Sequence, residues 1–178
     1  MKDIYGSDPE DKLQLYGFIL SGLKTLNEKL ISTFALIAML MAAVMTAVIL
    51  VQVFFRYFLS NALPWPEEAA RFMMVWMTFL VLPYGYHKKM NVNVEFLVER
   101  FGEKSKTVFE GFTHILVCVL SLYLLKQGID MTLRGNLIGA SSLPINMSLV
   151  YGVLPVSFLS LFLVALEKLM SRQEKGAE

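Results

Sequence analysis

The chain has 178 residues, 56% of them hydrophobic, and its formal net charge is +1. The apolar share exceeds the roughly 45–50% of soluble domains, and it is concentrated in long uncharged blocks. A near-neutral charge gives no reason to expect a nucleic acid or a strongly acidic partner. The single cysteine, Cys118, cannot form an internal disulfide, which argues against disulfide-exchange chemistry. The composition therefore predicts an all-α integral membrane protein.

The first 29 residues are polar overall but carry a regular apolar pattern from Asp11 onward. Apolar residues recur at steps of three and four, with lysines between them: Leu13, Tyr16, Leu20, Leu23 and Leu26. This pattern predicts an amphipathic helix with a basic polar face, lying in the membrane interface. A soluble helix packed on a partner remains the alternative for residues 1–29.

The following residues, 30–166, are expected to form a membrane domain of four transmembrane helices. Each apolar segment approaches or exceeds the roughly 20 residues that cross a bilayer. The expected spans are about 30–58, 65–86, 107–127 and 145–166, followed by a polar tail at 167–178. Pro155 should kink the last span, because proline breaks the helical hydrogen-bond ladder. A short surface helix is expected within 91–106 and a loop within 128–144.

Lysine and arginine predict the orientation of these spans. The N-terminal segment, the loop at 87–106 and the tail together carry twelve of them, whereas the loops on the other side carry only Arg134. The positive-inside rule therefore places both termini in the cytoplasm. In a bacterium this would be a multi-pass protein of the inner membrane, with the turn before the second span in the periplasm.

Three charges gather where the second span begins. Pro66 suits the first helical position, and Glu67 and Glu68 fall in the first turn, where the helix dipole favours carboxylates. Arg71 follows at the spacing that lets side chains meet on one helical face. The cluster is interpreted either as a local ion pair with a snorkelling arginine or as a polar contact to another membrane subunit.

No catalytic or cofactor-binding pattern is present. The chain lacks a glycine-rich phosphate loop and a metal-spaced cluster of histidine and cysteine, so we expect no cofactor, no metal and no catalytic residue. His114 is a candidate for a hydrogen bond between helices, and His87 for an interface residue. No charge falls at the middle of a span, where transporters usually place their polar groups. An accessory or structural subunit fits this pattern better than an autonomous transporter or a membrane-embedded enzyme.

At these residues the chain resembles the small membrane subunit, DctQ type, of tripartite ATP-independent periplasmic (TRAP) transporters. The likeness covers about 54–155. The residues that carry it are Phe55-Arg56-Tyr57, Pro64-Trp65-Pro66-Glu67-Glu68-Ala69-Ala70-Arg71, Trp76, Asn91-Val92-Asn93-Val94-Glu95, Ser141-Ser142-Leu143-Pro144, Tyr151 and Pro155.

The resemblance implies a non-catalytic subunit that braces a large membrane subunit. That partner would import an organic acid with sodium ions, and a periplasmic substrate-binding protein would deliver the acid. The proposed contacts with the partner or with membrane lipids are Arg56, Trp65, Glu67, Glu68, Arg71 and Trp76. The alternative is a small autonomous four-helix transporter of the drug-efflux kind, which should have a carboxylate inside its first span.

Overall fold

The computed structural model describes residues 9–60, 63–88 and 103–175, and helices dominate all three ranges. The helices are α1 (Pro9–Phe58), α2 (Trp65–His87), α4 (Glu103–Gly135), α5 (Met147–Tyr151) and α6 (Val153–Lys175). Within the described residues the only strand-like pairing is an isolated bridge between Gly139 and Asn146. The prediction of an all-α protein is confirmed.

Helix α1 is 50 residues long and has no break between the expected interfacial segment and the expected first span. At 1.5 Å per residue it extends about 75 Å, well over twice the thickness of a hydrocarbon core. Among its described side chains, from residue 17 onward, the buried ones are Leu20, Asn27, Ile31, Phe34 and Ala38. Their spacing of three, four and seven places them on one face, so a single helical stripe packs along the bundle.

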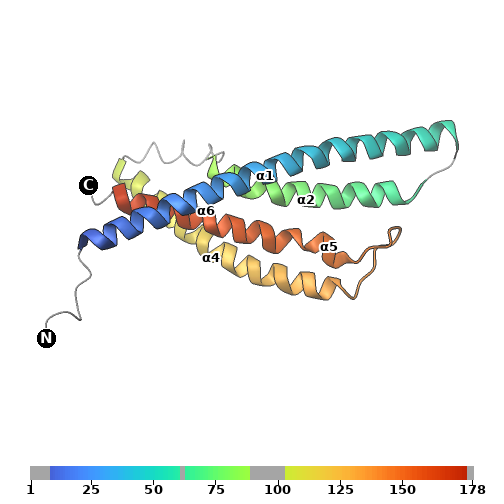
Figure 1. Cartoon of the computed structure of the whole chain (residues 1–178). Coiled ribbons are helices and arrows are strands. Elements are labelled where there is room, and N and C mark those ends of the chain that lie inside the picture. Colours follow the sequence, from blue (N-terminus) through green and yellow to red (C-terminus); the bar gives the residue numbers. More distant parts are fainter. Residues whose placement is uncertain (1–8, 61–62, 89–102, 176–178) are drawn as a thin grey trace.

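The long helices form two antiparallel pairs, α1 with α2 and α4 with α6 (Figure 1). Helix α6 joins the pairs, because it packs against α1 and α2 as well as α4. Helix α1 begins and α6 ends at the same end of the bundle (Figure 1). We call this the terminal end, and we call the opposite end, where α2 begins, the loop end.

The apolar core is small and lies where α1, α2 and α6 meet. Phe34, Ala38, Leu80 and Val153 are buried there, and Trp76 of α2 packs against them. Large apolar side chains cover much of the outer surface: Leu50, Phe58 and Val119 are all more than half exposed. In water such a surface would be strongly unfavourable, whereas lipid or another membrane protein can cover it.

Pro83 lies inside α2, and the fold compensates for the hydrogen bond that it removes. A proline has no N–H, so the carbonyl of Phe79, four residues earlier, loses its partner within the helix. The hydroxyl of Ser157 in α6 donates a hydrogen bond to this carbonyl. Ser157 is fully buried, so this bond joins α2 to α6 in the interior of the bundle.

The expected fourth span is divided at Gly152 into α5 and α6, three residues before Pro155. This break agrees with the expected effect of the proline. Helix α4 continues to Gly135, beyond the expected end of the third span, so the following loop is shorter than expected. A Cβ on Gly135 would lie 2.8 Å from the backbone nitrogen of Ser148, which explains how α4 and α5 approach so closely. The surface helix expected within 91–106 lies mostly outside the described residues, and α4 already begins at Glu103.

Three of the described helical segments are long and apolar enough to cross a membrane: Gly17–Phe58, Gly111–Gly135 and Met147–Ser171. Helix α2 is less apolar and is not among these segments. It carries Arg71 near its start and a Pro-Tyr-Gly-Tyr-His sequence at its end, which lower its mean hydropathy. The crossing of the membrane by α2 therefore stays a prediction.

Candidate functional site

A polar cluster lies at the start of α2, at the loop end of the bundle. It is formed by Trp65, Glu67, Glu68 and Arg71, and the side chains of Glu67 and Arg71 are largely exposed. Arg71 and Glu67 form an ion pair one turn apart, with 69% and 61% of their side chains exposed. Trp65 is 40% exposed, and Pro66 beside it is buried. An exposed pair of this kind contributes little to folding, about 0–1 kcal/mol. Because the two side chains are exposed, another molecule can reach their polar atoms.

Glu68, unlike its neighbour Glu67, is bonded to a distant part of the chain. Its carboxylate accepts hydrogen bonds from the backbone N–H groups of Ser141 and Ser142, at 2.8 and 2.6 Å. Glu68 thereby fastens the loop between α4 and α5 to the start of α2.

The two remaining candidate residues from the sequence lie apart from this cluster. Arg56, in the last turn of α1, is exposed. Trp76 is partly buried and packs against the core of α1, α2 and α6. The structure thus brings Glu67 and Arg71 together, gives Glu68 a partner within the chain, and assigns Trp76 a packing contact.

A second group of polar side chains lies at the terminal end. The Tyr86 hydroxyl is 2.6 Å from Nδ1 of His114, which joins α2 to α4. Lys168 of α6 donates to the Tyr86 carbonyl oxygen at 2.6 Å, and its Nζ lies 4.7 Å from the centre of the Tyr86 ring. The hydrogen bond between helices expected of His114 is therefore present, and Tyr86 is its partner.

Helix α1 is tied into the same end through Asn27. Its Nδ2 donates to the Glu167 carboxylate at 2.6 Å and is also within 3.2 Å of the Leu163 carbonyl oxygen. Asn27 is 1% exposed and Glu167 is 8% exposed, although Glu167 was placed in the polar tail by the sequence. Asn27, Tyr86, His114, Glu167 and Lys168, here named the polar network, connect all four long helices.

The network was not evident from the sequence, because its members are isolated polar residues far apart in the chain. One signal was present: Asn27 lies on the apolar face that continues into the first span. A polar residue on a buried stripe needs a partner, since burying an amide without a hydrogen bond is costly.

The described residues of the expected interfacial stripe become more exposed from Leu20 to Leu26. Leu13 and Tyr16 are in α1, but their side chains lie outside the described part of the structure. Leu20 is buried, Leu23 is partly buried and Leu26 is 49% exposed. Leu20 thus packs within the chain, whereas Leu26 faces outward.

Within the described residues there is no group of three or more histidine, cysteine or acidic side chains that could hold a metal ion. Asn27, Tyr86, His114 and Ser157 use their polar groups to join helices to one another. This arrangement can hold the helices in register and present apolar surfaces to lipid or to another protein.

A family model described as tripartite ATP-independent periplasmic transporters, DctQ component, matches residues 45–175. The matched segment includes the end of α1 from residue 45 onward, all of α2 and α4–α6, and so both Glu68 and the Tyr86–His114 pair. Asn27 and the rest of α1, up to residue 44, precede it. Among curated proteins, none matches the chain.

Proposed function

Since the chain belongs to the DctQ-component family of tripartite ATP-independent periplasmic transporters, we propose that it braces a larger membrane subunit. It is a membrane-embedded small component of a TRAP transporter, and its proposed part in transport is non-catalytic. The larger subunit would carry an organic acid together with sodium ions across the bacterial inner membrane. A periplasmic substrate-binding protein would deliver that acid.

The observation that carries this proposal is the way the bundle divides its polar and apolar groups. The polar network and the Ser157–Phe79 bond use interior polar groups to join helices to one another. Apolar side chains, by contrast, cover the outside of the same helices. A rigid scaffold with lipid-facing and partner-facing surfaces needs this division, whereas a self-sufficient carrier needs polar groups around a central substrate path.

We propose that α2 is the fourth span and that the terminal end faces the cytoplasm. The support is the concentration of lysine and arginine in the segments at that end, under the positive-inside rule. The polar cluster at the start of α2 would then face the periplasm. The first turns of α1 would extend along the cytoplasmic membrane surface, with Leu26 toward lipid.

The proposed contacts with the large subunit are Trp65, Glu67, Arg71 and Arg56. The exposed Glu67–Arg71 pair supports this choice, because its polar atoms remain accessible. Glu68 and Trp76 would contribute indirectly, Glu68 by fixing the adjoining loop and Trp76 by packing α2 into the core.

Reconstitution into liposomes tests the proposed function. With an inward sodium gradient, this chain, the large subunit and the binding protein together should accumulate a labelled organic acid, while this chain alone should not. The same liposomes without this chain should lose most of the uptake. Uptake of a lipophilic cation by this chain alone would contradict the proposal and favour the drug-efflux alternative.

A further inference from the structure

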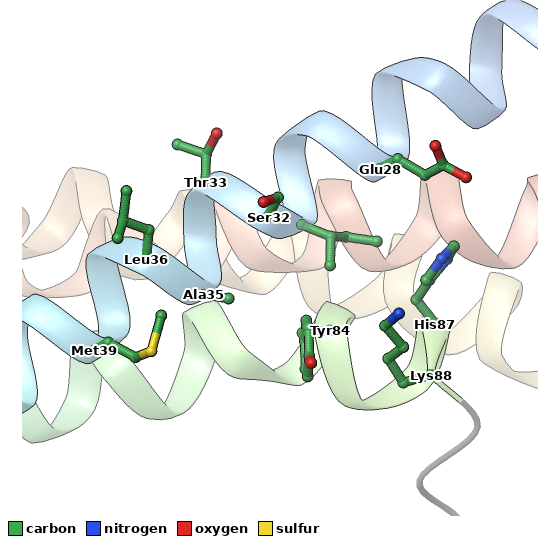
Figure 2. Close-up of a pocket in the computed structure, with 10 residues that line it drawn as sticks. Glu28, Ser32, Thr33, Ala35, Leu36, Met39, Tyr84, His87 and Lys88 are labelled. Carbon is green, nitrogen blue, oxygen red and sulfur yellow. The ribbon is translucent and has the colours of Figure 1, made fainter.

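An open groove of about 580 Å³ lies between α1 and α2 near the terminal end. Figure 2 shows Glu28 of α1 and His87 and Lys88 of α2 gathered at one end of it. Leu36 and Met39 of α1 line the other end. The groove is therefore polar at one end and apolar at the other.

The polar end holds charges that have no ion-pair partner in the described part of the chain. Neither Glu28 nor Lys88 has an ion-pair partner among the described residues. Nδ1 of His87 is buried and has no hydrogen-bond partner in the part of the chain that the structure describes. His87 and Lys88 of α2 thus line the groove opposite the Glu28 carboxylate of α1. Glu28 and Lys88 are exposed and open to a ligand.

The apolar end continues the groove along the helix axis. From Glu28 to Met39 the helix rises about 16 Å, at 1.5 Å per residue. Leu36 and Met39 are 54% and 63% exposed, so a chain lying in the groove would cover them. A ligand with a charged head and a long hydrocarbon tail matches this gradient better than a polar metabolite does.

We propose that this groove binds one phosphatidylethanolamine molecule. Its phosphate would meet Lys88 and His87, its primary ammonium would donate hydrogen bonds to Glu28, and one acyl chain would follow Leu36 and Met39. An anionic headgroup without an amine would leave Glu28 unpaired beside a negative charge. A choline headgroup has no N–H to donate to that carboxylate.

Only one side of the groove lies within the residues that the family model matches. Its α1 side, Glu28 to Met39, precedes the residues that the family model matches, whereas its α2 side lies within them. The inference requires α1 and α2 to be embedded in a membrane, but it does not depend on the transported substrate or on the large subunit. Its failure would therefore leave the proposed function intact.

Native mass spectrometry of the full-length chain, titrated with phosphatidylethanolamine, phosphatidylglycerol or phosphatidylcholine of identical acyl chains, tests the inference. The expected result is one retained phosphatidylethanolamine, preferred over each of the other lipids by about fivefold, as for a partly exposed ion pair. Glu28→Gln should remove the preference over phosphatidylglycerol, and Lys88→Gln should weaken binding of all three lipids. Lys24→Gln, an exposed change on α1 outside the groove, should alter neither.

Equal retention of the three lipids, or an unchanged preference in Glu28→Gln, would overturn the inference. A protein occupant is the other possibility, and a photo-crosslinker at Ser32 in the complete complex distinguishes it. Crosslinks to phospholipid are expected. Crosslinks to a helix of the large subunit, with the lipid absent, would show that the groove is a protein interface and would overturn the inference as well.

Discussion

The two ends of the bundle use charged and polar residues in opposite ways. At the terminal end, Asn27 and Glu167 are almost fully buried and bonded to each other across two helices. At the loop end, Glu67 and Arg71 pair on one helix with most of their side chains exposed. Burial makes a hydrogen bond consequential, because a lost partner cannot be replaced by water. The comparison indicates that the buried Asn27–Glu167 bond helps to maintain the fold, whereas the exposed Glu67–Arg71 pair leaves its polar atoms accessible.

The largest expected loss of stability comes from Asn27→Ala. The change leaves the buried Glu167 carboxylate without its donor, so the free energy of unfolding should fall by about 1–3 kcal/mol. Thermal unfolding of the purified chain in detergent measures this effect. Thr25→Ala is the matched control, because Thr25 is exposed and its hydroxyl bonds only to its own helix.

The double variant Asn27→Leu/Glu167→Leu sharpens the same point. Replacing both partners with apolar groups of similar size should recover most of the lost stability, since no buried polar group is left unpaired. If the double variant is as unstable as the sum of the two single variants, the Asn27–Glu167 bond is not what makes Asn27→Ala costly.

The next expected effect concerns the bond that compensates for Pro83. Ser157→Ala leaves the Phe79 carbonyl without a partner inside the bundle, which should cost about 1–2 kcal/mol. Adding Pro83→Ala restores an N–H to α2 and should rescue much of that loss. Ser160→Ala removes a similarly buried hydroxyl that bonds within its own helix, and it should cost less. Unfolding curves in which Ser157→Ala/Pro83→Ala is no more stable than Ser157→Ala would contradict this interpretation of Pro83.

A local rather than global effect is expected for Glu68→Ala. The change removes both acceptors from the amides of Ser141 and Ser142, so hydrogen exchange at these amides should accelerate. Glu67→Ala, one residue away, is the control and should leave them protected.

The smallest expected change in stability belongs to Arg71→Ala, about 0–1 kcal/mol, as for other exposed ion pairs. Its effect on the complex should be larger, with less large subunit co-purified and less uptake, because truncating one side of a contact leaves the other side unpaired. Lys126→Ala, an exposed change on α4, should be nearly silent in both measurements. Full complex yield and uptake in both Arg71→Ala and Glu67→Ala/Glu68→Ala would show that the cluster is only a local pair and a loop fastening.

Local patterns in the sequence were sufficient for the helices, but not for the contacts between them. Uncharged blocks indicated long helices and Pro155 indicated a kink in the last span, because these features act along one segment. The observed break lies at Gly152, three residues before the proline. The continuity of α1 was not predicted, since the change from an amphipathic to an apolar pattern near Leu30 suggested a boundary. The bundle packs along one face on both sides of that point, so no break is needed.

The same limit applies to the candidate site. The Glu67–Arg71 pair follows from helical spacing and was anticipated as one interpretation of the cluster. The bond from Glu68 to Ser141 and Ser142 joins residues more than 70 positions apart, so no local pattern indicates it. The same is true of Asn27 with Glu167 and of Ser157 with the Phe79 carbonyl. Each depends on which helices are neighbours.

The most direct test of the central claim, that this chain is a bracing subunit, is its state when extracted from native membranes. The full-length chain, tagged at its C-terminus, would be purified in mild detergent, and its partners and molar ratio determined by mass spectrometry. The account predicts that a large multi-span membrane protein elutes with it in stoichiometric amount. Elution of the chain alone, or as a homo-oligomer without that partner, would contradict the account.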